Sequence, residues 1–288
     1  MSSSYEEKAD PVIYLYCLAR PECLSVVKSL AEQGAPGVDE RHPISLLQQD
    51  ELVAVIGEVN LSEFSDQNLQ ALDWVAPRAC RHEVVVETIM GASPVLPVKF
   101  GTIFRSPTSL IELLTQHGDI ISRFLEKLRD KAEWSVKGYL GEGVARRKVA
   151  AADPAIQSRL ATLSPSPGAR YFQQKQIDGM VEVALRVWAG RLTRDIHEAL
   201  AAHAVEATEL GFLSSAATGH PERMIFNGSF LVTHAALPDF RAALSSFSIQ
   251  HSAFGVTFEL RGPWPPYNFC PNLTGDHPLK LLRERAMD

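Results

Sequence analysis

Three prolines fall within four residues near the C-terminus, in the segment Arg261-Gly-Pro-Trp-Pro-Pro-Tyr-Asn-Phe269. Proline lacks a backbone N–H and fixes φ near −65°, so this run should neither continue a strand nor begin a helix. A residue that precedes proline is also pushed toward an extended conformation. The sequence therefore predicts a stiff, extended, polyproline-like arm that leaves the sheet after residue 260. We call residues 261–269 the C-terminal arm.

The C-terminal arm carries Trp264, Tyr267 and Phe269, and two roles for these aromatic residues are open. The arm can fold back and fill the core of its own domain. Alternatively, part of it forms a contact surface for another protein, because a side chain that is already held in place loses little entropy when it docks.

Composition narrows the class of protein. At 288 residues the chain is long enough for one large domain or two ordinary ones. Hydrophobic residues make up 45% and charged residues 22%, which predicts a packed core rather than a disordered chain. The net charge of −6, without a basic block, argues against nucleic acid or anionic lipid as the main partner.

The N-terminal residues and the cysteines predict the cellular compartment of the protein. Residues 1–10 are polar and acidic, so we expect no signal peptide. No apolar run approaches the ~20 residues of a membrane span. The four cysteines, Cys17, Cys23, Cys80 and Cys270, lack paired spacing. They are the reduced thiols expected of a cytoplasmic protein.

The first half of the chain predicts a β-α-β-β-α-β order. The expected strands are 12–17, 44–47, 52–57 and an edge strand at 94–100, whose prolines exclude it from the centre of a sheet. The polar Gln48-Gln-Asp50 between the second and third strands suits a hairpin. One helix begins at Pro21. A second, capped by Ser65, has apolar positions at Leu69, Leu72, Val75 and Ala79. This order is that of a ferredoxin-like fold.

The second half predicts the same order after an added helix that starts at Ser106-Pro107. The expected strands are 133–139, 210–213, 223–233 and 254–260, with a helix near Pro238. A long helix should run from Arg170 to about Val205 and carry one apolar stripe: Ile177, Val181, Ala184, Trp188, Leu192 and Ile196. The fold predicted is therefore α+β, with two ferredoxin-like domains at 1–130 and 131–288.

Motifs of catalysis and cofactor binding are missing. His82-Glu83 is not followed by a second histidine one turn later, so the zinc-protease pattern is absent. Gly141-Glu-Gly143 has no third glycine and no Lys-Ser/Thr pair, and there is no Gly-x-Ser-x-Gly elbow. The i,i+4 pair Glu83 and Glu87 is explained by a solvated helix face. We expect no catalytic, cofactor-binding or metal-binding residues, and no enzyme activity.

RNA binding has to be considered, because RRM domains share the β-α-β-β-α-β order. The first strand, at 13–18, resembles their aromatic motif. The third, at 52–59, lacks the aromatic and basic residues that stack on and anchor bases. Tyr14 and Tyr16 are then packing or surface residues.

Six stretches together resemble one protein family. They are Val12-Ile-Tyr-Leu-Tyr16, Arg81-His-Glu-Val-Val-Val-Glu87 after Trp74, Pro94-Val-Leu-Pro-Val-Lys-Phe-Gly-Thr102 with Phe104, Glu133-Trp-Ser-Val-Lys137, Ser166-Pro-Gly-Ala-Arg-Tyr-Phe-Gln-Gln-Lys175 and Gly262-Pro-Trp-Pro-Pro-Tyr-Asn-Phe269. In this order and over nearly the whole chain they resemble the gas vesicle protein family GvpL/GvpF. Lys99 stands where the family often has arginine, which keeps the charge and loses bidentate geometry.

The resemblance implies a cytoplasmic, non-enzymatic protein of gas vesicle formation, located at the gas vesicle. It would be a minor structural component or an assembly factor. Its implied partner is the small, hydrophobic major shell protein, GvpA-like, with other accessory Gvp proteins as further partners. A scaffold that links accessory gas-vesicle proteins, or a small-molecule-binding ferredoxin-like protein, is the alternative.

The candidate partner-binding residues lie in two places. Arg261, Trp264, Tyr267 and Phe269 belong to the C-terminal arm, and Arg170, Tyr171 and Lys175 to the start of the long helix. The competing interpretation is that the same motifs are fold determinants, with prolines setting turns and tryptophans filling cores. Neither the oligomeric state nor the partner's own binding surface follows from the sequence.

Overall fold

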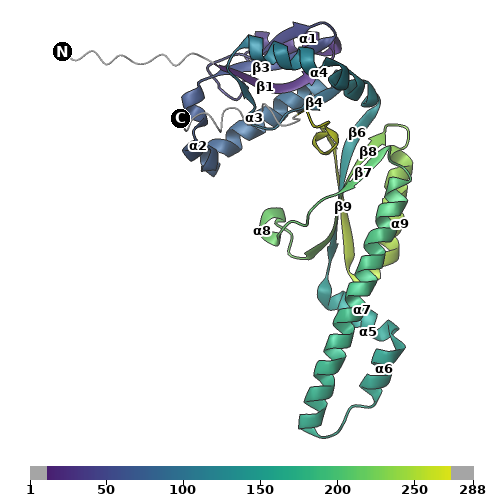
Figure 1. The fold of residues 1–288 in the computed structure, drawn as a ribbon. Coiled ribbons are helices and arrows are strands. Elements are labelled where there is room, and N and C mark those ends of the chain that lie inside the picture. Colours follow the sequence, from purple (N-terminus) through teal and green to yellow (C-terminus); the bar gives the residue numbers. More distant parts are fainter. Residues whose placement is uncertain (1–11, 274–288) are drawn as a thin grey trace, which may run out of the picture. The chain divides into compact units, whose positions relative to one another are not determined.

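The computed structural model describes residues 12–273 and divides into two compact units (Figure 1). Unit 1 contains residues 12–130 together with the segment from Trp264 onward, and unit 2 contains Lys131–Pro263. The chain therefore returns to unit 1 after unit 2 is complete. This placement differs from the prediction, which assigned the C-terminal arm to the second domain.

Unit 1 is built on an antiparallel sheet in which β2, β3, β1 and β4 are neighbours in that order. The strands are β1 (Val12–Ala19), β2 (Ser45–Gln49), β3 (Leu52–Val59), β4 (Val95–Pro97) and β5 (Ile103–Phe104). Asp50, with φ of 51°, lies in the turn that joins β2 to β3 and forms the predicted hairpin. The predicted edge strand is shorter than expected, because β4 ends at Pro97 and β5 pairs with β1 beyond a loop.

Helices cover both faces of this sheet, since all eight residues of β1 are buried. Tyr14 and Tyr16 lie in a core cluster with Val27 of α1 and with Val85 and Ile89 of α3. Because successive strand residues point to opposite faces, the alternate residues of β1 face the α4 side. The helices are α1 (Leu24–Glu32), α2 (Asp66–Gln70), α3 (Leu72–Met90) and α4 (Pro107–Lys127), with short 3-10 turns at Pro21–Cys23 and Leu61–Phe64.

Local signals fix several of these helix ends. The Ser106 side chain accepts a hydrogen bond from the Ser109 backbone N–H, with Pro107 at the first helical position, so α4 begins where predicted. Ser65 caps α2 as expected. The single helix predicted after Ser65 is wrong, however. Ala71 is extended, with ψ of 108°, and its carbonyl accepts the first hydrogen bonds of α3, so two helices replace one.

Unit 2 has a sheet with the neighbour order β7, β8, β6 and β9. Its elements are β6 (Lys131–Leu140), α5 (Glu142–Ala152), α6 (Pro154–Ala161), α7 (Pro167–Ala201), β7 (Glu206–Glu209), α8 (Ser215–Thr218), β8 (Arg223–Thr233), α9 (Leu237–His251) and β9 (Val256–Trp264). Phe230 and Phe240 pack with Ile196 and Leu200 of α7 in its main core cluster. The long helix and α9 thus cover one face of the sheet.

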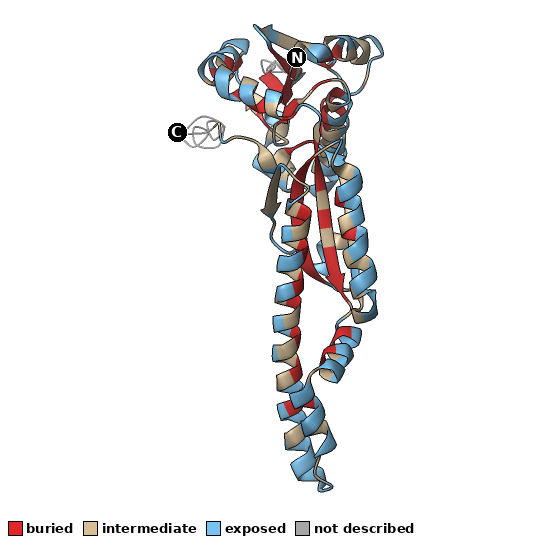
Figure 2. Ribbon diagram, turned by 90° about the vertical axis from the view of Figure 1, so that its right-hand side faces the viewer, coloured by how far each residue is buried: buried red, intermediate tan, exposed pale blue. Residues whose placement is uncertain are grey.

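The 35 residues of α7 correspond to roughly 50 Å of helix. Its buried positions form one stripe, seen as a red line along the long helix in Figure 2. The stripe consists of Ile177, Val181, Leu185, Ala189, Leu192, Ile196 and Leu200. Ala184 and Trp188, which the sequence placed on the stripe, are only half-buried. Near its start α7 packs on α6, where Ile156 contacts Ile177 and Val181.

Two strand predictions in unit 2 are wrong. Residues 206–209 form β7 in place of residues 210–213, because Glu206–Glu209 pair in register with Leu231–Gly228 of β8. Beyond them the Leu210 N–H still donates to the Asn227 carbonyl, but at residue 211 the Asn227 side-chain amide donates to the Gly211 carbonyl in place of a backbone group. The last strand also runs past residue 260. β9 includes Gly262, Pro263 and Trp264. Its position at the edge of the sheet accommodates a residue that cannot donate to a ladder.

The remainder of the C-terminal arm is not polyproline-like. Tyr267–Phe269 form a 3-10 turn, in which the Phe269 N–H donates to the Pro266 carbonyl. The prediction of an extended arm is therefore wrong, because hydrogen bonding within unit 1 holds this segment in a turn. The mixed α+β class with antiparallel sheets is confirmed. The assignment of both units to the ferredoxin-like plan stays a prediction.

Candidate interaction site

The C-terminal arm is anchored to α3 through the Tyr267 hydroxyl. This hydroxyl donates a hydrogen bond to Glu83 Oε1 at 2.8 Å and lies 3.3 Å from His82 Nε2. Pro265 and Pro266, which precede it, are buried, and the Cys270 thiol approaches the Pro97 carbonyl at 3.7 Å. From Trp264 onward the arm is thus a docked segment of unit 1, held by a tyrosine–carboxylate hydrogen bond.

Beneath the arm, His82 of α3 contacts two further elements. Its Nδ1 lies 2.8 Å from the Tyr14 hydroxyl of β1, and its Nε2 lies 3.0 Å from the Val98 carbonyl in the loop after β4. A carbonyl can only accept, so Nε2 carries the proton and Nδ1 accepts from Tyr14. The Tyr14 oxygen in turn accepts the Gly101 N–H at 3.2 Å. One neutral imidazole therefore ties β1, α3 and the loop together.

The electrostatics agree with a neutral imidazole. Burial lowers the pKa of His82 to about 4, against the raising effect of its bond to the Val98 carbonyl. Burial also raises the pKa of Glu83 and that of Tyr267, and the negative charge of Glu83 raises the Tyr267 pKa further. Tyr267 therefore keeps its proton at neutral pH and donates it to Glu83. We expect the site to work by packing and hydrogen bonding rather than by proton transfer.

Tyr16, a second tyrosine of β1, lies in the same core cluster. The Tyr16 hydroxyl accepts the Val38 N–H at 2.8 Å, and burial raises the pKa of Tyr16 to about 12. Gly37 lies directly under this hydroxyl, so that a Cβ at position 37 would be only 2.5 Å from the oxygen. The loop before β2 is therefore held to β1 through a close approach that requires glycine.

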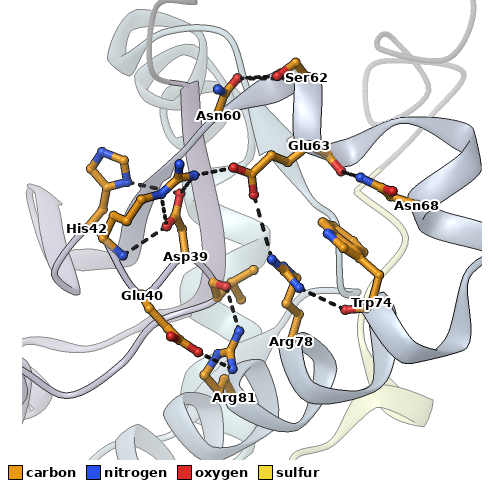
Figure 3. Close-up of polar contacts among 12 residues, drawn as sticks. Asp39, Glu40, His42, Asn60, Ser62, Glu63, Asn68, Trp74, Arg78 and Arg81 are labelled. Carbon is orange, nitrogen blue, oxygen red and sulfur yellow. Dashed lines mark hydrogen bonds and ion pairs between the residues drawn. The ribbon is translucent and has the colours of Figure 1, made fainter.

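An ion-pair network fastens that loop to α3, as Figure 3 shows. The buried Asp39 accepts two hydrogen bonds from the Arg41 guanidinium, at 2.9 and 2.8 Å. Arg41 also pairs with Glu63, which lies 3.8 Å from Arg78 on α3. The hydrogen bonds from Arg41 lower the pKa of Asp39 to about 2. These charges position the loop, and all of them have partners within unit 1.

The other predicted residues of the arm are more exposed. Trp264 ends β9 with 39% of its surface exposed, and Phe269 is half-buried. Arg261, which belongs to unit 2, is exposed and pairs with Glu259 at 3.1 Å. The arm therefore combines a docked part around Tyr267 with a solvent-facing part at Trp264.

The predicted residues of the long helix lie at its exposed start. Arg170, Tyr171 and Lys175 are all exposed, and Lys175 Nζ lies 5.3 Å from the centre of the Tyr171 ring. Their neighbour Phe172, which the sequence analysis did not single out, is 68% exposed and packs edge-on against Tyr171. We call residues 170–175 the aromatic end of α7.

Sequence reasoning missed His82 and Glu83 as the anchors of the arm. The explanation of Glu83 by a solvated face is wrong, because it is half-buried and accepts the Tyr267 hydrogen bond. The signal was present in the Arg81-His-Glu motif. However, nothing in that motif names Tyr267, 184 residues away, as its partner.

Residues 12–273 contain no group of three or more His, Cys, Asp or Glu side chains arranged to hold a metal ion. Among the helices in the same range, none combines the length and hydropathy that crossing a bilayer requires.

The comparisons with known proteins agree on one family. The model of the gas vesicle synthesis protein GvpL/GvpF family matches residues 12–271. The chain belongs to the GvpL/GvpF family. It is 29% identical to gas vesicle protein L of a Streptomyces species, over 91% of this chain and 93% of that protein. It is 25% identical to gas vesicle protein F of the same strain, over 89% and 98%.

Solved structures show that this GvpL/GvpF chain also shares the fold of GvpF. The crystal structure of GvpF from an Anabaena species matches with a TM-score of 0.65 at 17% identity, over 91% of this chain and 97% of that one. GvpF from Microcystis aeruginosa matches with a TM-score of 0.60 at 17% identity, over 90% and 99%. Four of the six stretches that carry the family resemblance meet at His82: those of β1, α3, the loop after β4 and the C-terminal arm.

Proposed function

We propose that this protein acts in gas vesicle formation by binding the hydrophobic major shell protein, GvpA-like, as a minor structural component or assembly factor without catalysis. A shell subunit with exposed apolar surface aggregates unless a partner covers it or delivers it to the growing wall. Membership of a gas vesicle synthesis family supports the process. The partner and the absence of catalysis are our inference.

The observation that carries the proposal is large apolar surface left open on an acidic chain. Tyr171 and Phe172 are 58% and 68% exposed at the aromatic end of α7, and Trp264 is 39% exposed. Aromatic residues in such positions are the usual anchors of protein interfaces, because they bury much area at a small cost in entropy. We therefore place shell-protein contacts at Arg170, Tyr171, Lys175, Arg261, Trp264, Tyr267 and Phe269, with Phe172 added.

The test is co-expression of the protein with the GvpA-like subunit of the same organism, followed by affinity capture and a solubility assay. Specific capture, with more shell subunit in the soluble fraction, is the expected result. No capture, with the subunit still aggregating, would contradict the proposal. It would favour the scaffold alternative, which the same capture with the accessory Gvp proteins would then test.

A pocket in unit 2 supports a second candidate function, small-molecule binding. It has a volume of about 680 Å³ and lies between the start of α5 and the loop before β8, lined by Leu140, Phe212 and Met224 with Glu222 and Arg223. Pockets of this size accept small ligands. A ligand that raises the melting temperature of the purified protein would favour this candidate.

We extend the proposal to the fold, and treat both units as variants of the ferredoxin-like plan. Each unit has four main strands, which we number here by their order along the chain. In both sheets the second strand lies beside the third, the third beside the first, and the first beside the fourth. Helices separate the first strand from the second and the third from the fourth in both. This shared order supports a common plan.

A further inference from the structure

The sheet edges of the two units differ in how well they are protected. An edge strand exposes backbone donors and acceptors, and proteins blunt such edges with proline, charge or irregularity. The β4 side of unit 1 carries Pro94 and Pro97 and is interrupted before β5. In unit 2, β9 contains Pro263. The other edge of unit 2, β7, carries Glu206 and Glu209 in four residues.

The fourth edge, β2, has none of these features. Its sequence, Ser-Leu-Leu-Gln-Gln, contains no proline and no charge. All five residues pair with β3 on one side, from Ser45 opposite Ile56 to Gln49 opposite Leu52. On its other side no strand of residues 12–273 pairs with β2. A regular, uncharged ladder edge is therefore open in unit 1.

An apolar groove runs beside this edge, between β2 and α1. It has a volume of about 440 Å³ and is lined by Leu24, Val27, Lys28, Ala31, Ile44, Ser45 and Leu46. Lys28, the one charged residue in this lining, pairs with Glu32 at 3.8 Å. The groove therefore favours uncharged, apolar side chains, because five of its seven lining residues are apolar.

From this combination we infer that the outer edge of β2 accepts an extended, uncharged segment of the shell protein as an additional strand. The segment's backbone would continue the ladder, and its alternate apolar side chains would enter the groove between α1 and β2. This inference rests on the proposed function, since it names the surface through which the hydrophobic shell partner binds. An extended polypeptide is required, because only a strand satisfies a row of backbone donors and acceptors.

A second copy of this chain fits the same edge less well. If two β2 strands paired, each would have to supply the side chains that fill the other's groove. Leu46 is already packed against its own core cluster, and the exposed side chains of β2 are Ser45 and Gln48, which are polar. A second copy therefore leaves the apolar groove unfilled, whereas a hydrophobic segment fills it.

Two substitutions block the site in different ways. Ala31→Arg places bulk and charge in the groove from an exposed position on α1, and Gln48→Lys places a charge on the exposed edge strand. The matched controls are Ser25→Arg, on α1 outside the groove lining, and Thr208→Lys, on the edge strand β7. Circular dichroism and melting curves establish that all four variants fold.

The measurement is capture of the co-expressed GvpA-like shell protein by each variant. We expect wild type and both controls to capture it, and Ala31→Arg and Gln48→Lys to retain about a tenth or less, because each places an unpaired charge in the interface. Equal capture by all variants would overturn the strand inference and leave the proposed function standing. No capture even by wild type would overturn both.

Two further readouts of the same samples identify the occupant. Hydrogen exchange should show that backbone amides in residues 45–49 become protected when wild type binds the shell protein. Unchanged exchange there, alongside real capture, would contradict strand addition. A wild-type dimer in light scattering that Ala31→Arg abolishes, with shell capture intact, would assign the edge to a second copy and overturn the inference.

Discussion

The Tyr267 hydroxyl donates to Glu83 Oε1 across 184 residues of sequence, at a distance of 2.8 Å. This hydrogen bond joins the C-terminal arm to the helix that carries the Arg81-His-Glu motif. Both groups belong to unit 1, so the last described segment of the chain completes the unit that the first strand began. The proline-rich motif therefore has a structural role in closing unit 1, while the exposed Trp264 leaves room for a role in binding.

The first prediction concerns this anchor. Tyr267→Phe removes the hydroxyl and leaves the half-buried Glu83 without its donor. We expect a loss of roughly 1.5–3 kcal/mol in the free energy of unfolding, measured by urea titration, because hydrogen bonds to charged groups contribute in this range. Tyr171→Phe, on the exposed aromatic end of α7, is the matched control. Equal losses of unfolding free energy in the two variants would show that the Tyr267 hydroxyl does not stabilise the docked arm.

The second prediction is a pH dependence that His82 creates. Its pKa falls from 6.5 to about 4 in the folded protein, so between these values the unfolded chain binds more protons. His82 therefore stabilises less as pH falls from 6.5 toward 4, by at most about 3 kcal/mol at 1.36 kcal/mol per pKa unit. The raised pKa of Glu83 acts in the opposite direction near the lower end of the window. Urea titrations of wild type at pH 4.5–7 measure the slope.

His82→Gln tests whether the slope belongs to this histidine. The variant is less stable at every pH because it alters the bonds to Tyr14 and Val98. However, its stability should decline less steeply than that of wild type between pH 6.5 and 4.5. If the two curves run parallel, a different group is responsible.

The third prediction separates buried from exposed charges in the ion-pair network. Asp39 is 8% exposed and accepts two hydrogen bonds from the Arg41 guanidinium, so Asp39→Ala should cost roughly 1–3 kcal/mol by removing these charge-assisted hydrogen bonds. Glu40→Ala is the neighbouring control. It removes a surface pair with Arg81 and should cost much less, since exposed ion pairs are weak. Thermal unfolding of the two variants measures both losses of stability. Similar losses in Asp39→Ala and Glu40→Ala would contradict the prediction.

The fourth prediction addresses the aromatic end of α7. The double variant Tyr171→Ala/Phe172→Ala should change stability by no more than about 0.5 kcal/mol, because both rings are exposed. It should nevertheless reduce capture of the GvpA-like shell protein. Ile249→Ala, a 73% exposed apolar residue on α9, controls for a general loss of apolar surface. Undiminished capture by the double variant would remove this end of α7 from the proposed interface.

Signals that act over a few residues were visible in the sequence. Ser106-Pro107 predicted the start of α4, the polar turn at Asp50 predicted the β2–β3 hairpin, and the apolar spacing from Ile177 to Ile196 predicted the long helix. Cap, turn and periodicity are local physics, since each depends on neighbours within one or two turns of the chain. The family resemblance was equally visible, because its motifs are contiguous in sequence.

The tertiary structure decided which residues distant in the sequence pair with one another. The prolines of the C-terminal arm restrict φ locally, but they do not reveal that β9 lies at a sheet edge and so runs on to Trp264. Glu83 has the spacing of a solvated carboxylate, and it becomes an acceptor only because Tyr267 is brought to it. β2 likewise became an open edge only when the sheet order left it unpaired on one side. Local signals in the sequence by themselves determined the start of α4, the β2–β3 hairpin and the long helix, whereas the packing of the sheets determined where β7 and β9 pair and which surfaces remain available.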